Sequence, residues 1–286
     1  MQRVYPFLFV FLWSTGFIGA KFGLPYAEPL SFLLVRYLFV VGVMLVVALA
    51  TRAPWPSQPR QWVHIGVAGL LVHAIYLGGV FVAIHRGLPA GVTALVVGTQ
   101  PILTAFGANW LLHEKVSARQ WLGLVLGFVG VVLVVGGKVA LDAPAGSLAG
   151  MLIPIVVALF SITLGTLYQK RFCPSFDLRT GSVIQFVPTA VATFVLAALT
   201  EDFRIEWTGR FVFALFWLVC VLSLGAISLL NLLIRRGTAV NVASLFFLTP
   251  PTTAIIAFIV FGETLTGVAL AGMALAVTGV YLARKT

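Results

Sequence analysis

The sequence predicts an all-helical integral membrane protein in which ten transmembrane helices form two inverted five-helix repeats. Three observations predict this fold. Hydrophobic residues make up 60% of the 286 residues and charged residues only 9%, whereas soluble proteins carry about 25% charged residues. Apolar stretches of membrane-spanning length recur along the chain, and the chain matches itself at a nearly constant offset. A surface this apolar must face a lipid bilayer.

Ten apolar stretches are long enough to cross a membrane. A helix spans the hydrocarbon core with about 20 residues, and a lipid-facing stretch must be helical because no water binds its backbone there. The expected helices are residues 5–23, 31–51, 62–85, 88–112, 119–137, 148–170, 180–200, 210–234, 238–262 and 265–283. Turn-forming segments that separate them lie at 23–29, 52–60, 142–146 and 173–177. The gaps are short, so no soluble domain is expected.

The basic residues predict how these helices are oriented. Twelve of them fall in the loops on the side of the chain ends and five on the other side, while Arg36 falls within the second helix. The twelve are Arg3, Arg52, Arg60, Lys115, Arg119, Lys170, Arg171, Arg179, Arg235, Arg236, Arg284 and Lys285, and the five are Lys21, Arg86, Lys138, Arg204 and Arg210. Because basic loops stay in the cytoplasm, both termini are expected on the cytoplasmic side of a bacterial-type inner membrane.

The same composition disfavours other classes of protein. The net charge of +10 comes from scattered residues, not from the clustered basic patch of a nucleic-acid-binding protein. Cys173 and Cys220 suggest neither a disulfide framework nor a metal site, and no cofactor is expected. The first apolar stretch has a weak basic leader, Arg3, and no small-residue cleavage site. This favours a retained helix over a signal peptide.

The chain repeats itself after 149 residues. Pro101 corresponds to Pro250 and Glu114 to Glu263 at this offset. Other matched positions are Gly16 with Gly165, Lys21 with Lys170, Gly123 with Gly272, Gly130 with Gly279, and, at an offset of 150, Arg86 and Gly87 with Arg236 and Gly237. The expected repeats are residues 1–140 and 141–286. Five helices are an odd number, so the second copy enters the membrane from the opposite side, as in transporters with a site at the midplane.

These residues also carry a family resemblance. The segment WSTGFIGAKFG at 13–23, Pro29 followed by Arg36, and the two Pro-x12-Glu elements resemble the EamA-type ten-span exporters of the drug/metabolite transporter superfamily. The residues STG at 14–16 stand where that family often has glycine directly after the tryptophan. Within it, the chain is most similar to the YddG-type amino-acid exporters. The resemblance implies export of small metabolites through a cavity lined by helices 1, 3, 4, 6, 8 and 9.

Prolines interrupt the fourth and ninth expected helices. Pro101, Pro250 and Pro251 are expected near the middle of these helices, where each removes a backbone donor and leaves a carbonyl unpaired. In lipid that carbonyl needs another partner. The kinks are either harmless packing features or hinges that gate the cavity, and their presence in both repeats favours hinges.

His73, Tyr76 and Arg36 lie inside expected helices. His73 and Tyr76 are one turn apart on the third helix, and a histidine inside a membrane usually faces a polar interior. It could bind a substrate carboxylate or carry a proton, or it could bond to a neighbouring backbone carbonyl. Arg36 either extends outward to the interface or is the counter-ion to a carboxylate, that of a substrate or of Glu263.

Further cavity candidates are polar or amphipathic residues of the helices expected to converge. They are Trp13, Ser14, Thr15, Thr99, Gln100, Ser161, Thr163, Tyr168, Ser223, Ser228, Asn231 and Thr249. Ligand cavities are mostly apolar with a few placed polar groups, although Ser and Thr also bond within their own helix. Glu114 and Glu263 are expected to cap the next helix in the chain or to act in gating. Gly123, Gly127 and Gly130 form a small-residue face for close packing, internal or between protomers.

The sequence therefore predicts an exporter and not an enzyme. No Walker, GxGxxG, HExxH or GxSxG motif occurs in it. The expected function is alternating-access export of a small metabolite, with an aromatic or apolar amino acid favoured. The alternatives are a drug or other metabolite exporter, an intramembrane enzyme and a non-transporting scaffold, the last two without a supporting constellation. Monomer and homodimer both remain open.

Overall fold

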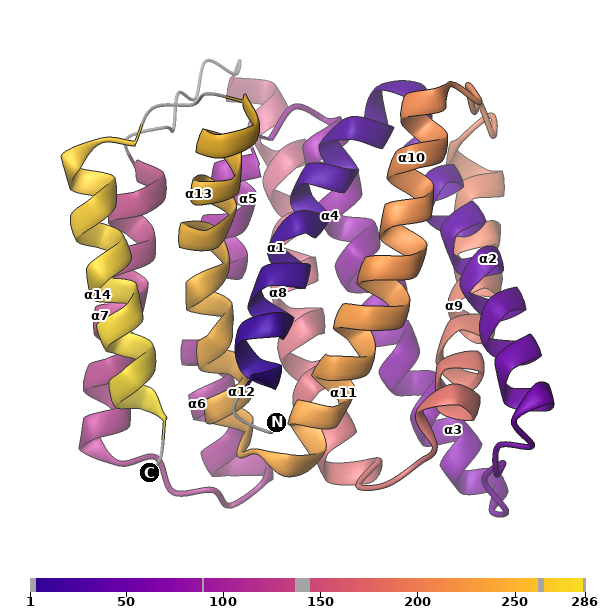
Figure 1. The fold of residues 1–286 in the computed structure, drawn as a ribbon, viewed down its shortest axis with the longest axis horizontal. Coiled ribbons are helices and arrows are strands. Elements are labelled where there is room, and N and C mark those ends of the chain that lie inside the picture. The colour runs from indigo at the N-terminus through magenta and orange to yellow at the C-terminus, as the bar shows by residue number, and fades with distance from the viewer. Residues whose placement is uncertain (1–3, 89, 137–144, 262–264, 285–286) are drawn as a thin grey trace.

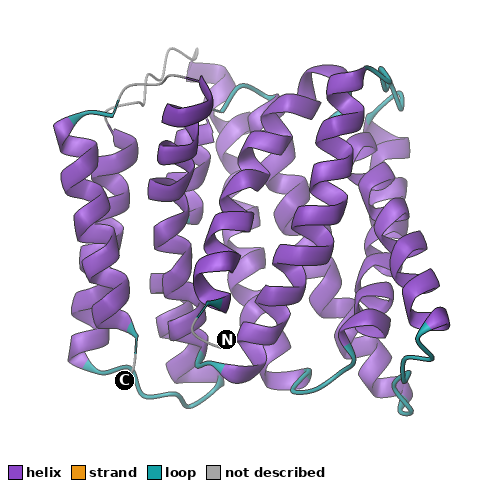
Figure 2. Cartoon of the chain, viewed as in Figure 1, coloured by secondary structure: helices purple, strands orange, loops and turns teal. Residues whose placement is uncertain are grey.

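The computed structural model is a bundle of helices standing side by side (Figures 1 and 2). It describes residues 4–88, 90–136, 145–261 and 265–284, so Glu263 lies outside the described residues. Within these ranges there is no strand, and Ala27 and Ile205 form a single isolated antiparallel bridge. The all-helical prediction is therefore confirmed for the part of the chain that the structure describes.

The helices follow the apolar stretches of the sequence. Six stretches are single helices: α1 (Tyr5–Gly23), α2 (Pro29–Ala50), α7 (Ala118–Gly136), α8 (Ala145–Phe172), α9 (Leu178–Thr200) and α14 (Gly267–Ala283). The others are composite: α3 (Pro59–Gly69), η2 (Leu70–Ile75) and α4 (Tyr76–His85); α5 (Ala90–Val97) and α6 (Gln100–Leu111); α10 (Gly209–Trp217), η3 (Leu218–Ala226) and α11 (Ile227–Arg236); α12 (Ala239–Ser244), η4 (Leu245–Leu248) and α13 (Thr249–Phe261). A short 3₁₀ turn, η1 (Leu24–Tyr26), follows α1.

Membrane-spanning length is reached by most of these runs. Over the described residues, eight helical runs are long and apolar enough to cross a membrane, and α14 is a shorter apolar helix. The predicted helix at 88–112 is not continuous, because the chain turns at Gly98 and Thr99 between α5 and α6. Each of these two pieces is too short to span a bilayer by itself.

Local sequence explains where many helices begin. Prolines stand in the first turn of α1, α2 and α3, where a missing N–H costs nothing. The side chains of Thr208, Thr238 and Thr266 accept a hydrogen bond from the backbone N–H three residues on, and so cap α10, α12 and α14. Asp177 caps α9 through the N–H of Arg179.

Two close helix pairs flank the centre of the bundle. In Figure 1 the pair α7 and α14 stands at one end and the pair α2 and α9 at the other, with the remaining helices between them. The start of α1 and the end of α14 lie at the same side, here called the terminal face; the other side is called the opposite face. The pocket described below lies between α2 of one flanking pair and the central helices.

Glycines allow α7 and α14 to pack backbone against backbone. A Cβ added to Gly130 would lie 2.4 Å from the backbone nitrogen of Ala276, and one added to Gly123 would lie 2.5 Å from that of Ala283. Gly127 instead faces the ring of Phe247. The small-residue face of the fifth expected helix is therefore used for packing inside this chain.

Candidate binding pocket

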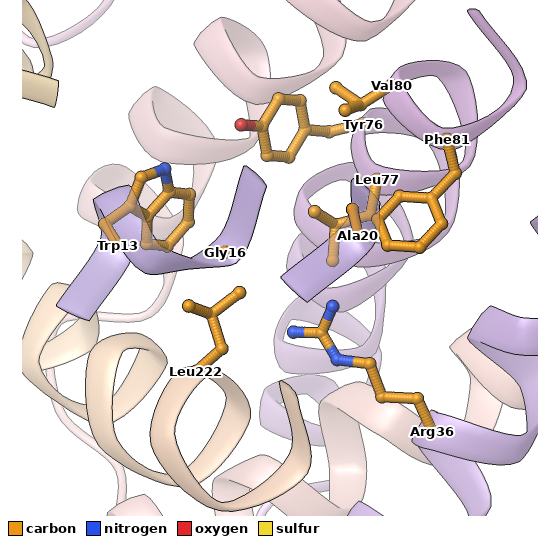
Figure 3. A pocket seen from close by; sticks show the side chains of 9 residues that line it. All are labelled: Trp13, Gly16, Ala20, Arg36, Tyr76, Leu77, Val80, Phe81 and Leu222. Carbon is orange, nitrogen blue, oxygen red and sulfur yellow. The ribbon is translucent and has the colours of Figure 1, made fainter. Parts of the chain in front are cut away.

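A buried pocket lies between α1, α2, α4 and η3 (Figure 3). Its lining is apolar apart from a few polar groups, which is the usual composition of a ligand site. The lining residues are Trp13, Gly16, Ala20, Arg36, Tyr76, Leu77, Val80, Phe81 and Leu222. The side chains leave about 30 Å³ for the centres of water-sized molecules, which is room for about two waters. A larger ligand requires the lining to move apart.

Aromatic clusters close the pocket toward both faces. Toward the terminal face, the ring of Phe246 packs edge-on against two other rings. Its centroid lies 5.5 Å from the ring centroid of Phe9 and 5.2 Å from that of Trp13. Toward the opposite face, Phe32 packs against Phe81 and against Phe211 near the start of α10. All of these rings are buried. The pocket is thus enclosed between two layers of aromatic side chains.

Arg36 is the charged residue of this pocket. Its side chain is only 1% exposed, so it does not extend to the membrane interface, the first alternative considered from the sequence. The Nε atom donates a hydrogen bond of 3.0 Å to the Oγ of Ser223 on η3. The two terminal nitrogens have no hydrogen-bond partner among the described residues. Arg36 therefore lies on the face of α2 that packs against η3, in the protein interior.

Two π-helical segments lie at or next to the pocket: η3 in the eighth helical run, whose Leu222 lines it, and η2 in the third, which directly precedes α4. They contain His73 and Ser223, which are 150 residues apart, the offset that also relates Arg86 to Arg236. The wide turns of a π-helix leave some carbonyl groups without an α-helical hydrogen bond. In η2, two carbonyls accept hydrogen bonds from side chains of other helices. Ser161 on α8 donates to the carbonyl of Leu71, and Tyr37 donates to that of His73. Such π-segments are rare and are frequent at functional sites.

His73 itself is buried at 1% exposure. Its ring stacks on Phe186 of α9 with 4.2 Å between ring centroids, and neither ring nitrogen has a hydrogen-bond partner in the described part of the chain. Tyr76, one turn on, lines the pocket and faces Trp13 with nearly parallel rings 6.5 Å apart. The structure therefore brings Tyr76 and Trp13 together in the pocket and places His73 beside α9.

A buried triad of amides lies nearer the terminal face. Gln185 donates to Gln169 at 3.1 Å, Gln169 donates to Asn231 at 2.9 Å, and Asn231 donates to Gln185 at 3.5 Å. The three side chains are at most 2% exposed, and each amide both donates and accepts. Sequence reasoning selected Asn231 and missed the two glutamines. Their signal was present, because amides are rare in apolar helices and need partners there.

The prolines begin helices instead of bending them. Pro101 is the second residue of α6, and Pro250 and Pro251 follow the first residue of α13. The preceding segments are the turn at Gly98 and Thr99 and the 3₁₀ helix η4. The expected mid-helix kinks are thus helix interruptions, at which a missing proline N–H leaves no broken helical bond.

Of the polar residues around these interruptions, Gln100 and Thr249 are buried and Thr99 is half-buried. Thr99 donates to the carbonyl of Val96, whereas the amide of Gln100 and the hydroxyl of Thr249 have no partner among the described residues. The carbonyl of Thr249 accepts a hydrogen bond from Ser14 on α1. These groups tie α1 to the start of α13 but do not line the pocket.

The remaining cavity candidates have local roles or lie elsewhere. Ser14 and Thr163 each donate to a carbonyl four residues back in their own helix. Thr15 accepts a hydrogen bond from the indole of Trp217 and lines a separate apolar groove with it. Tyr168 lies near the terminal face in a hydrogen bond of 2.6 Å with His64. Ser228 is half-buried on α11.

Charged residues at helix ends serve as caps. Glu114 accepts a hydrogen bond from the N–H of Ala239 and so caps α12, not the next helix in the chain as expected. An acidic side chain is stabilised at a helix N-terminus. Here that helix is α12, which packs against α6 in space. Lys170 donates to the carbonyls of Ile234 and Gly237 at the end of α11.

These features define a class of protein. Apolar helices of membrane-spanning length surround a buried, mostly apolar pocket with one arginine, which is the architecture of a multi-pass membrane transporter. The EamA-like transporter family matches residues 4–136 and again residues 148–284. The chain therefore belongs to the EamA-like transporter family, and it is a transporter and not an enzyme.

Individual relatives agree with this family. The chain is 30% identical over 280 residues to the "Uncharacterized transporter YvbV" of Bacillus subtilis, covering 96% of this chain and 88% of that protein. It is 24% identical over 286 residues to the "Probable amino-acid metabolite efflux pump" of Salmonella typhimurium, covering 96% of this chain and 92% of that protein. A solved crystal structure matches with a TM-score of 0.79 at 20% identity, over 98% of this chain and 95% of that one.

Proposed function

We propose that this transporter exports small metabolites, with aromatic or apolar amino acids favoured, by alternating access between two inverted repeats. The observation that carries the proposal is the pocket enclosed between two aromatic layers. A site closed on both sides by movable side chains can open to one face at a time. The relative named as an amino-acid metabolite efflux pump supports this substrate class.

Several observations support the repeats at 1–140 and 141–286. The family matches the chain twice, over stretches of similar length. The π-segments η2 and η3 occupy corresponding positions, and so do the interruptions before α6 and α13. The flanking pairs also correspond, because α2 with α9 and α7 with α14 each join the same helix of the two halves. Two copies related by an axis in the membrane plane exchange conformations when the site changes sides.

In this mechanism the terminal face is cytoplasmic, in the inner membrane, as the basic residues predict. Substrate enters when the Phe9, Trp13 and Phe246 cluster separates. It leaves when the Phe32, Phe81 and Phe211 cluster separates. The interruptions before Pro101 and Pro250 act as hinges, since a turn and a 3₁₀ segment lack the regular i→i−4 hydrogen bonds of an α-helix and bend more easily.

Counterflow in proteoliposomes tests the function. Vesicles with purified protein are loaded with one unlabelled compound at a time, either an amino acid or a lipophilic cation, and entry of the same labelled compound is followed. We expect accumulation for phenylalanine, leucine or related amino acids and none in protein-free vesicles. No accumulation for any amino acid with folded protein would contradict the amino-acid assignment, and accumulation of lipophilic cations alone would favour a drug exporter.

A further inference from the structure

The two terminal nitrogens of the Arg36 guanidinium have no hydrogen-bond partner among the described residues. Figure 3 shows the guanidinium directed toward the centre of the ring of lining side chains. Ser223 holds Nε at 3.0 Å. A planar guanidinium fixed at Nε presents its terminal N–H groups as a fork that matches the two oxygens of a carboxylate.

No acidic side chain of the described chain is available to pair with this charge. The described acids stand at helix ends or in loops: Glu28, Glu114, Asp177, Glu201, Asp202 and Glu206. Four of them accept hydrogen bonds at these ends: Glu28 and Glu114 from backbone N–H groups, Asp177 from Arg179, and Glu201 from two backbone N–H groups and the Ser31 hydroxyl at the start of α2. A buried charge without a partner is unfavourable, so an anionic group bound beside Arg36 would stabilise it.

We propose that Arg36 binds the carboxylate of the transported substrate, with Ser223 as the positioning residue. This inference rests on the proposed function and names the chemical group that the pocket recognises. One cation lines the pocket, which suits a singly charged carboxylate. A phosphate carries about two charges at neutral pH and would remain partly unpaired.

The rest of the lining defines the body of the substrate. Trp13, Leu77 and Phe81 offer apolar and aromatic surface, so the substrate joins a carboxylate to an apolar group. Arg36 then recognises what all such substrates share, and the aromatic lining selects among them. Binding also places an opposite charge beside the arginine, which neutralises it inside the membrane.

Ligand series on purified full-length protein test this assignment. Thermal shift and equilibrium binding are measured with L-phenylalanine and L-leucine, with their amides, and with 3-phenylpropionate and phenethylamine. We expect each carboxylate to bind at least 10-fold more tightly than its uncharged or cationic counterpart, because charge-assisted bidentate hydrogen bonds are lost in the counterpart.

Three variants locate the effect. Arg36→Met retains apolar volume without charge, and we expect it to abolish the preference for carboxylates. Arg36→Lys keeps the charge without the fork and is expected to weaken carboxylate binding about 10-fold, and Ser223→Ala is expected to weaken it less. Arg210→Met, at an exposed arginine of α10, is the matched control and should leave the preference intact.

The outcomes separate this inference from the proposed function. Equal binding of acids and amides by the wild type, or an unchanged preference in Arg36→Met, would overturn the carboxylate assignment even if transport is present. Binding of 3-phenylpropionate that depends on Arg36, without binding of any amino acid, would support it and contradict amino-acid export. If Arg36→Met does not fold, the comparison of acids with amides in the wild type decides alone. A folded wild type that binds none of the carboxylates would contradict both proposals.

Discussion

The carboxylate of Glu114 lies 3.0 Å from the backbone nitrogen of Ala239, which is 125 residues later in the chain and begins α12. The end of the fourth helical run thus caps the start of the ninth. A negative charge at a helix N-terminus is stabilised both by the hydrogen bond and by the helix dipole. This contact joins the two halves of the chain at the terminal face.

Removing this cap should destabilise the fold. We expect Glu114→Ala to lower the free energy of unfolding by about 1 kcal/mol. In thermal unfolding in detergent, the melting temperature should fall by about 2–4 °C. Glu206→Ala, at an exposed carboxylate in a loop, is the control and should change little. Equal melting temperatures for the two variants would mean that the Glu114 contact contributes nothing.

The packing of α7 on α14 predicts a strong effect of one methyl group. In Gly130→Ala the new Cβ would lie 2.4 Å from the nitrogen of Ala276 and 2.6 Å from the carbonyl oxygen of Gly272. These are backbone atoms, so the helices must separate. We expect the free energy of unfolding, measured by heat or denaturant, to fall by about 1–3 kcal/mol.

Gly42→Ala is the matched control for this variant. A Cβ at Gly42 meets nothing within 4 Å, and alanine has the higher helix propensity. Its stability should equal or exceed that of the wild type. A Gly130→Ala protein as stable as Gly42→Ala would show that the two helices are not in the close contact described here.

The helix interruptions predict a kinetic effect of the prolines. Pro101→Ala and the double variant Pro250→Ala/Pro251→Ala restore backbone N–H groups, which favours continuous helices and stiffens the hinges. We expect slower counterflow in both variants at normal expression. Wild-type rates in both would eliminate the hinge role and leave the prolines as packing features.

Burial predicts that the Cys173 thiol is unreactive in the folded protein. The residue is 5% exposed, and burial raises the pKa of its thiol to about 12. At pH 8 the thiol of the folded protein therefore keeps its proton. Above the ordinary thiol pKa of about 8.5 only the unfolded chain releases this proton, so the free energy of unfolding should fall as the pH rises. In a Cys220→Ala background, maleimide labelling at pH 8 should be slow until the protein unfolds. Complete labelling of the native protein within minutes would contradict this.

Much of the helical pattern could be predicted from hydropathy. The expected helix at 5–23 coincides with α1, and that at 180–200 differs from α9 by two residues at its start. The interruption before α6 was expected as a kink inside one helix, because a proline looks the same in sequence at a bend and at a helix start. The π-segments were not expected at all, since no residue type marks a wide helical turn.

Side-chain surroundings were harder to predict than helices. Arg36 lies about two turns inside α2, and whether it meets water, lipid or protein depends on how α2 is rotated against η3. The partner of Glu114 is likewise a spatial neighbour and not the next helix in the chain. Trp13 and Tyr76 were selected as cavity residues and do line the pocket, because large amphipathic side chains in converging helices have few other places to lie.

Access to Ala20 from each side of the membrane tests the alternating-access mechanism most directly. Ala20 is 2% exposed and lines the pocket. Ala20→Cys would be made in a Cys173→Ala/Cys220→Ala background, reconstituted in one orientation and treated with a membrane-impermeant thiol reagent from one face or the other. The mechanism predicts reaction from both faces, with substrate supplied on one side shifting the ratio of the two rates. Reaction from only one face, whatever the substrate conditions, would contradict it.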